Sequence, residues 1–317
     1  YIEPLRFLFI SSYDRSMSNT YIPARPFGSV SVAMVTPFHA DGSLDIDSAC
    51  RLADKLVTEG CDSILLSGTT GESPTTHQPE KDDLVRAVKD TIGERAMLVA
   101  GAGSNDTAHA VRIAQGAAAA GADGLLVVAP YYNRPSQAGV YQHISAVTAA
   151  TELPVMIYDI PGRTGVKISE DTLLRLAENP QIQAVKDATG DVAAGFQKMR
   201  RTGLAYYSGD DGLNFAWLAH GASGVISVAG HLIASSLRRL VQAVDAGDLP
   251  AARAEFARQM PIVDAIMGSG QGAVMAKEAL HLLGVLPQAN LRLPLVGANP
   301  EELAQLEAVL RKEGFLG

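Results

Sequence analysis

Short apolar segments rich in β-branched residues recur along this chain, and longer segments with helical spacing lie between them. We predict eight strands, at residues 29–36, 63–67, 97–100, 124–129, 155–158, 183–186, 205–208 and 224–228. We predict intervening helices at residues 47–59, 79–92, 107–120, 140–150 and 170–178. Strands that are apolar along their whole length are typical of parallel sheets covered by helices. Eight of them in alternation with helices predict an α/β fold, a (β/α)8 TIM barrel.

A doubly wound open sheet is the alternative arrangement. The segment most like a nucleotide-binding fingerprint, residues 101–106, lacks the third glycine of that motif. Its last residues, 104–106, are of the kind that cap a helix. The barrel is therefore favoured over a dinucleotide-binding sheet.

The chain outside the barrel has a different pattern at each end. We assign the barrel to residues 27–247 and a three-helix region to 248–317, with helices at 250–267, 271–284 and 300–312 and no strand between them. This region is expected to pack on the barrel and to contribute to subunit contacts. Residues 1–26 form an N-terminal extension, and within it residues 1–16 are expected to precede the native start at Met17.

Composition excludes several classes of partner. The chain has 317 residues, of which 47% are hydrophobic and 19% charged, so it can bury a large core. Its net charge of -8 argues against nucleic acid and anionic membranes, whose partners usually carry a basic surface. No apolar run reaches the length of a membrane-spanning helix. The cysteines, Cys50 and Cys61, lack CxxC spacing and are expected to be buried thiols in a reducing cytoplasm.

Lys186 ends an apolar strand just before a glycine-containing turn, a place where barrel enzymes carry their chemistry. Its amine could attack a carbonyl and form a Schiff base if the site lowers its pKa by excluding water. Tyr158 is a candidate proton acceptor, and Arg163 a candidate clamp for a carboxylate because its planar fork donates two parallel hydrogen bonds. Each also has an ordinary interpretation, since strand-end lysines and loop arginines commonly reach for solvent.

Two other motifs follow predicted strands. Residues 68–73 include Thr69 and Thr70, whose hydroxyls could hold a carboxylate and pass a proton, although a tight turn with a helix cap is an equal alternative. In residues 130–135, two prolines make a rigid loop that projects one tyrosine outward, and simple loop packing is the alternative there.

The adjacent carboxylates Asp210 and Asp211 raise the question of a metal ion. No third acidic or histidine ligand follows at a suitable spacing, so one of the two is expected to cap a helix beginning near Leu213. The histidines show no HxH or HExxH arrangement, and most are expected at the surface or in loops: His77, His109, His143, His220, His231 and His281. We predict no metal.

The motifs GTTGES, PYYNRPSQ, YDIPGRTG, VKDATGD, SGDD and GVISV occur together in one order and spacing. From residue 27 to the end, the chain resembles the dihydrodipicolinate synthase family of class-I, pyruvate-dependent aldolase barrels. The resemblance implies that Lys186 forms a Schiff base with pyruvate and that Tyr158, Thr69 and Tyr132 relay protons, with Tyr132 reaching a neighbouring subunit. It also implies that substrates are bound by Thr70, Arg163, Gly209 and Ile226.

The activity that this resemblance implies is condensation of pyruvate with aspartate semialdehyde in lysine biosynthesis, without a cofactor. It also implies a homo-oligomer, a tetramer built as a dimer of dimers. A lyase or aldolase on the same barrel that acts on a sugar acid or another oxo acid is the main alternative. A catalytically silent barrel with a binding or regulatory role is the third.

The resemblance also bears on feedback regulation. Lysine-sensitive members of the family use a histidine and a glutamate at an interface pocket, where this chain has Lys81 and His109. These replacements remove an attractive carboxylate and add a like charge, so we predict weak or absent inhibition by L-lysine.

Overall fold

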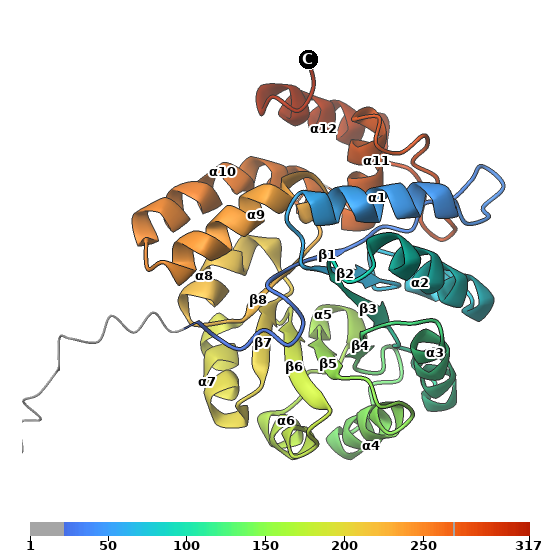
Figure 1. The fold of residues 1–317 in the computed structure, drawn as a ribbon, viewed down its shortest axis with the longest axis vertical. Coiled ribbons are helices and arrows are strands. Elements are labelled where there is room, and N and C mark those ends of the chain that lie inside the picture. The colour runs from blue at the N-terminus through green and yellow to red at the C-terminus, as the bar shows by residue number, and fades with distance from the viewer. Residues whose placement is uncertain (1–21, 269) are drawn as a thin grey trace, which may run out of the picture.

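The computed structural model describes residues 22–268 and 270–317, and its strands close into a parallel barrel (Figure 1). Each strand pairs with the next along the chain, and β1 also pairs with β8. The strands are β1 (Val30–Ala33), β2 (Ser63–Leu66), β3 (Met97–Gly101), β4 (Gly124–Val128), β5 (Val155–Asp159), β6 (Ile182–Asp187), β7 (Ala205–Ser208) and β8 (Gly224–Ser227). The predicted (β/α)8 barrel is confirmed. The expectation for residues 1–16 lies outside the described residues.

Helices surround the strands. Between β1 and β8 they are α1 (Ile46–Thr58), α2 (Gln78–Ile92), α3 (Thr107–Ala119), α4 (Gln137–Thr148), α5 (Pro161–Thr164), α6 (Glu170–Ala177), α7 (Val192–Thr202) and α8 (Asn214–Ala219), with 3-10 turns η1 (Ser73–Thr75) and η2 (Asp211–Leu213). Side chains cap the first backbone amides of many of them, including those of Asp45, Asp106, Ser136, Ser169 and Asp191.

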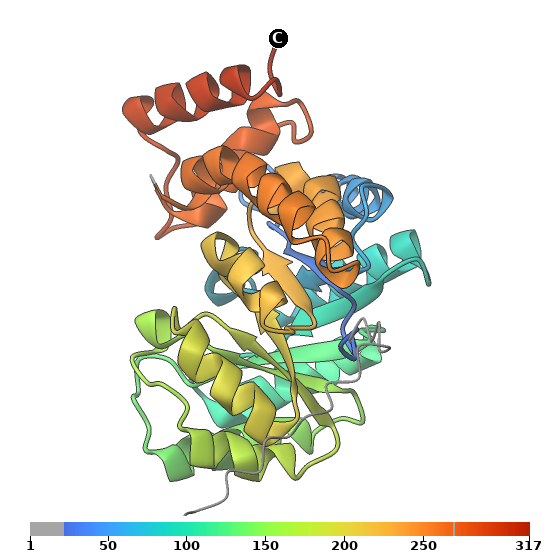
Figure 2. The same cartoon turned by 90° about the vertical axis from the view of Figure 1, so that its left-hand side faces the viewer.

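After β8 the chain is helical: α9 (Gly230–Asp245), α10 (Leu249–Met267), α11 (Gly272–Leu282) and α12 (Pro300–Lys312). The last three form the predicted C-terminal helical extension. Figure 2 shows them stacked beyond one side of the barrel, with α12 farthest out. The division into a barrel at residues 27–247 and a three-helix region at 248–317 stays a prediction.

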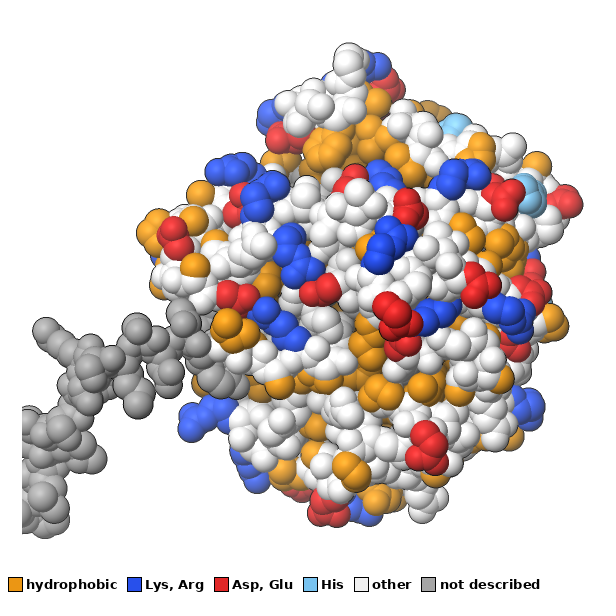
Figure 3. Space-filling model, in the orientation of Figure 1, with side chains coloured by type: hydrophobic (Ala, Val, Ile, Leu, Met, Phe, Trp, Pro, Cys, Tyr) orange, Lys and Arg blue, Asp and Glu red, His pale blue; other side chains and the backbone are white. Residues whose placement is uncertain are grey.

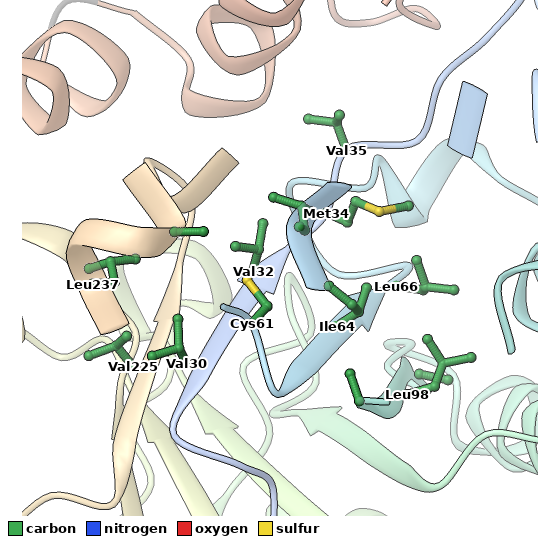
Figure 4. Close-up of a cluster of buried hydrophobic side chains, with 14 of the residues drawn as sticks. Val30, Val32, Met34, Val35, Cys61, Ile64, Leu66, Leu98, Val225 and Leu237 are labelled. Atoms are coloured by element: carbon green, nitrogen blue, oxygen red, sulfur yellow. The ribbon is translucent and has the colours of Figure 1, made fainter. Parts of the chain in front are cut away.

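Two apolar layers build the core. The inner cluster fills the barrel and consists of Phe27, Ala33, Leu65, Val99, Leu126, Met156, Tyr158, Ala184, Tyr207 and Ile226. The outer cluster lies between strands and helices, and Figure 4 shows the part where Leu237 of α9 lies beside Val30 and Val225, with Ile64 and Leu98 farther along the same layer. Alternate residues of each strand thus face the barrel interior and the helices, as the pleat requires.

A buried ion pair ties the C-terminal helices to the loop after β2. Lys277 of α11 donates to Glu72 at 2.5 Å, and both side chains are 1% exposed. Lys277 also donates to the carbonyl of Asn290, and the backbone amide of Arg292 donates to Glu72 at 3.0 Å. The Arg292 side chain forms a further ion pair with Glu80 of α2. The extension is therefore joined to the barrel by charge as well as by apolar packing.

One expectation about side-chain burial was wrong. Cys50 is only half-buried because it lies in the seam between α1 and α2, whereas Cys61 is buried as expected. Most of the six histidines are exposed, as expected, whereas His143 and His231 are buried, each with a hydrogen-bonding partner for one or both ring nitrogens.

The surface matches the mixed charge of the sequence. Acidic and basic side chains are interspersed on the face seen in Figure 3, without a field of one sign. Within residues 22–268 and 270–317, no helix is long and apolar enough to cross a membrane.

Candidate active site

Lys186 and Tyr158 lie side by side at the carboxyl-terminal end of the barrel. They are paired residues of β6 and β5, and both face the interior because Ala184 and Met156, two positions earlier, belong to the inner cluster. The Lys186 ammonium nitrogen lies 4.4 Å from the centre of the Tyr158 ring. Lys186 is 5% exposed, and this burial lowers the pKa of its amine to about 8; Asp211 acts in the opposite direction and Arg163 in the same one.

Burial has the opposite effect on the phenol. It raises the pKa of Tyr158 to about 12, while Arg163 and a hydrogen bond with the Thr69 side chain lower it. Near neutral pH the phenol of Tyr158 is therefore protonated and hydrogen-bonded to Thr69. The Lys186 amine beside it loses its proton more readily than an ordinary lysine does. This arrangement can supply an amine nucleophile and move a proton beside it.

The turn after β2 brings Thr69 to Tyr158 by close backbone packing. Ser67 adopts a left-handed φ of 52°, and its carbonyl oxygen would lie 2.2 Å from a Cβ at Gly101. Only glycine fits at Gly101, at the end of β3. The Thr36 hydroxyl donates to the carbonyl of Gly71 at 2.7 Å, and Thr70 is buried in the same turn.

A cavity of about 230 Å³ opens beside these residues. Tyr158, Thr69 and Arg163 line it, and Arg163 reaches it from the short helix α5. The remaining lining comes from Ser67, Gly68, Ser73, Pro74, Gly101, Gly103, Leu126, Val128, Tyr131, Ile160 and Thr164. Lys186 packs on the Tyr158 ring and is not itself among the lining residues. A small carboxylic acid can thus meet an arginine, hydroxyl groups and an apolar wall here.

The loop after β7 passes over the lysine. The backbone amide of Gly209 donates to the carbonyl of Asp187 at 2.8 Å, and a Cβ at Gly209 would lie 3.0 Å from Cε of Lys186. Gly209 thus leaves room for the lysine side chain. Asp210 caps η2, as predicted for one of the two carboxylates, while Asp211 turns inward to the turn after β8. Among the described residues, no group of three His, Cys, Asp or Glu side chains is placed to hold a metal ion.

Five predicted residues are not part of the cavity wall: Lys186, Thr70, Tyr132, Gly209 and Ile226. Tyr132 is 88% exposed and has a left-handed φ of 70°. Its neighbour Tyr131 lines the cavity instead. Ile226 lies in the inner cluster with Tyr158, beneath the mouth of the barrel.

The dihydrodipicolinate synthetase family matches residues 26–313 of the chain. The chain belongs to this family. A 4-hydroxy-tetrahydrodipicolinate synthase of Kineococcus radiotolerans is 53% identical over 293 residues, covering 92% of this chain and 95% of the relative. The synthase of Corynebacterium aurimucosum is 54% identical over 291 residues, covering 92% and 96%. The structure of a relative from Cyanidioschyzon merolae with lysine bound has a TM-score of 0.88 at 38% identity, covering 92% of this chain and all 100% of that one.

Membership in the dihydrodipicolinate synthetase family confirms the resemblance inferred from the motifs. Reasoning from the sequence missed Tyr131 in the cavity wall and the inward orientation of Asp211. The tyrosine pair gave no signal as to which ring faces the cavity. For Asp211 the only signal was the second carboxylate of SGDD, whose partners lie 16 to 18 residues later.

Proposed function

We propose that this protein is a 4-hydroxy-tetrahydrodipicolinate synthase, which condenses pyruvate with aspartate 4-semialdehyde through a Schiff base on Lys186. The observation that carries the proposal is a buried lysine, with a pKa lowered to about 8, packed on a tyrosine at the mouth of the barrel. Membership in the family and relatives of that name support it.

The first half of the reaction prepares a carbon nucleophile. The neutral amine of Lys186 attacks the ketone carbon of pyruvate, and the carbinolamine loses water to give an iminium. This cation acidifies the methyl group, and removal of a methyl proton leaves an enamine. Tyr158 and Thr69, with Tyr132 of a neighbouring subunit, carry protons between this centre and solvent. The lysine adduct is itself the electron sink, so no cofactor enters the proposal.

The second half forms and releases the product. The enamine carbon bonds to the aldehyde carbon of the semialdehyde, whose carboxylate pairs with Arg163. The amino group of that substrate then attacks the iminium carbon, closes the ring and expels the amine of Lys186. Thr70, Gly209 and Ile226 are assigned to holding pyruvate. The position of Arg163 in the cavity wall supports a substrate carboxylate there.

The assembly and its place in the cell are further parts of the proposal. A homotetramer, built as a dimer of dimers, would place the exposed Tyr132 at a neighbouring site. Free thiols at Cys50 and Cys61 support a reducing cytoplasm.

Trapping with borohydride in the presence of pyruvate tests the covalent step. The wild-type protein should gain the mass of a reduced pyruvate adduct at Lys186, and Lys186→Ala should gain none and lose turnover by several orders of magnitude. An adduct mapped to another lysine would refute the assignment. A coupled assay that compares aspartate semialdehyde with sugar aldehydes separates the synthase from a lyase acting on sugar acids. Absence of any adduct would favour a silent barrel.

A further inference from the structure

Asp211 is surrounded by hydrogen-bond donors, although it belongs to none of the groups assigned above to the reaction. Its first carboxylate oxygen accepts from the Ser227 hydroxyl at 2.5 Å and from the Asn214 amide at 3.1 Å. Its second accepts from the backbone amides of Val228 and Ala229, each at 2.9 Å. The residue is 3% exposed. Both oxygens act only as acceptors, which is the pattern of an ionised carboxylate.

Three of these four donors come directly after Ile226: Ser227 ends β8, and Val228 and Ala229 form the turn that follows it. His231 holds the other side of the same turn, because its Nδ1 lies 2.7 Å from the carbonyl oxygen of Val228. The backbone amide of Val35 donates to Nε2 of His231 at 3.0 Å, so Nδ1 carries the proton of the neutral ring. Burial lowers the pKa of His231 to about 4, which keeps it neutral. Val228 is thus fixed at its amide by Asp211 and at its carbonyl by His231.

The same loop contacts the reactive lysine. Gly209, two residues before Asp211, lies against Cε of Lys186 and is hydrogen-bonded to Asp187 on the lysine's strand. We propose that Asp211 is a positioning residue, which locks the turn after β8 at the barrel mouth and places a carboxylate in the loop that packs on Lys186. This inference rests on the proposed Schiff-base function.

The charge of Asp211 matters because the iminium is a cation that forms at a site shielded from water. The charged groups that act on Lys186 are Asp211, from the loop after β7, and Arg163, from α5, while the Tyr158 ring packs on it from β5. Arg163 repels a positive nitrogen, so Asp211 is the group that offsets it. Asp211 favours the ammonium before reaction and the iminium after it.

Asp211→Asn tests the charge with little change of shape. The rate of pyruvate adduct formation should reach half its maximum about one pH unit lower than in the wild type, because the ammonium loses its counter-charge. At a pH above the midpoints of both proteins, where the free amine is neutral, the equilibrium amount of adduct at subsaturating pyruvate should fall several-fold, because only the iminium then loses the charge. A merely structural role would leave the pH midpoint unchanged. It would also not raise the rate of adduct formation below the midpoint while lowering the equilibrium amount of adduct.

Asp62→Asn is a matched control. Asp62 also accepts from two backbone amides and a serine hydroxyl, those of Ser29 and Val30, but it lies just before β2 at the opposite end of the barrel. This variant should lose thermal stability while its pH midpoint stays at the wild-type value. An equal midpoint shift in both variants, or none in Asp211→Asn, would overturn the proposal.

Ser227→Ala keeps the inference testable if Asp211→Asn does not fold. It retains the carboxylate and removes one donor, so the pH midpoint should stay at or above the wild-type value while half-saturating pyruvate rises several-fold. Unchanged pyruvate dependence, or a lowered midpoint, counts against the role of Asp211. A wild-type protein that forms no pyruvate adduct would instead refute the proposed function itself.

Discussion

Burial acts in opposite directions on the two titratable side chains at the mouth of the barrel. It destabilises the ammonium of Lys186 and the phenolate of Tyr158, so both groups are biased toward their neutral forms. A neutral amine can attack a carbonyl, and a neutral phenol can donate a proton to the oxygen that leaves. The same dry environment therefore suits both partners of a proton exchange.

The pH dependence of adduct formation follows from the lysine. A pKa of about 8 leaves roughly one amine in ten neutral at pH 7, far more than for an ordinary lysine. The neutral fraction increases with pH, so the rate of pyruvate adduct formation should rise and level off above about pH 8. Stopped-flow or quenched trapping with pyruvate alone checks this. A rate that still climbs steeply at pH 10 would contradict the lowered pKa.

Arg163→Ala separates the two substrates. Pyruvate should still form its adduct, whereas kcat/KM for aspartate semialdehyde should fall about ten- to a hundredfold, the effect of losing a charged hydrogen-bonded pair. Arg175→Ala is the control, because Arg175 stacks on Tyr141 with 3.9 Å between its guanidinium carbon and the ring centre, away from the cavity lining. Semialdehyde kinetics that match the control would sink the assignment of Arg163.

At the scale of elements, the sequence predicted each strand to within a few residues, because apolar runs and the turns after them are local signals. The first residues of helices were predicted less accurately where the first helical turn contains no large apolar residues. Helix α4 begins at Gln137, three residues before the predicted start at 140, and Ser136 caps it. Contacts across the barrel could not be predicted, since the partners of Asp211 and Glu72 come from distant parts of the chain. The sequence motifs identified the candidate site residues. Only the closed barrel shows how far apart these residues lie.

The segment from η1 to α2 bears on regulation by L-lysine. Lys81 is buried and donates to the carbonyl and hydroxyl oxygens of Ser73 at 2.9 and 2.7 Å, so an internal amine already occupies these acceptors. His109 is exposed, and its ring lies 3.4 Å from the Ser104 hydroxyl. L-lysine should therefore inhibit weakly or not at all. Titration in the coupled assay checks this, and half-inhibition below about 1 mM, equivalent to roughly 4 kcal/mol of binding, would contradict it.

At the scale of the whole molecule, the role proposed for the exposed phenol of Tyr132 would link activity to assembly. Tyr132→Phe should depress turnover with little change in thermal stability, because the side chain is 88% exposed within its own subunit. Sedimentation at assay concentration, run beside the kinetics, measures the assembly. A fully active monomer, or full activity in Tyr132→Phe, would remove Tyr132 from the proton relay.

The ion pair between Glu72 and Lys277 sets an order for completing the site during synthesis. The two residues are 205 positions apart, and every barrel strand leaves the ribosome before Lys277 does. Until α11 emerges, Glu72, in the loop that carries Thr69 and Thr70, lacks the Lys277 ammonium beside which it is buried in the folded protein. Burying a carboxylate without such a partner costs free energy. We therefore expect this loop to take its final position only when the last helices have been synthesised.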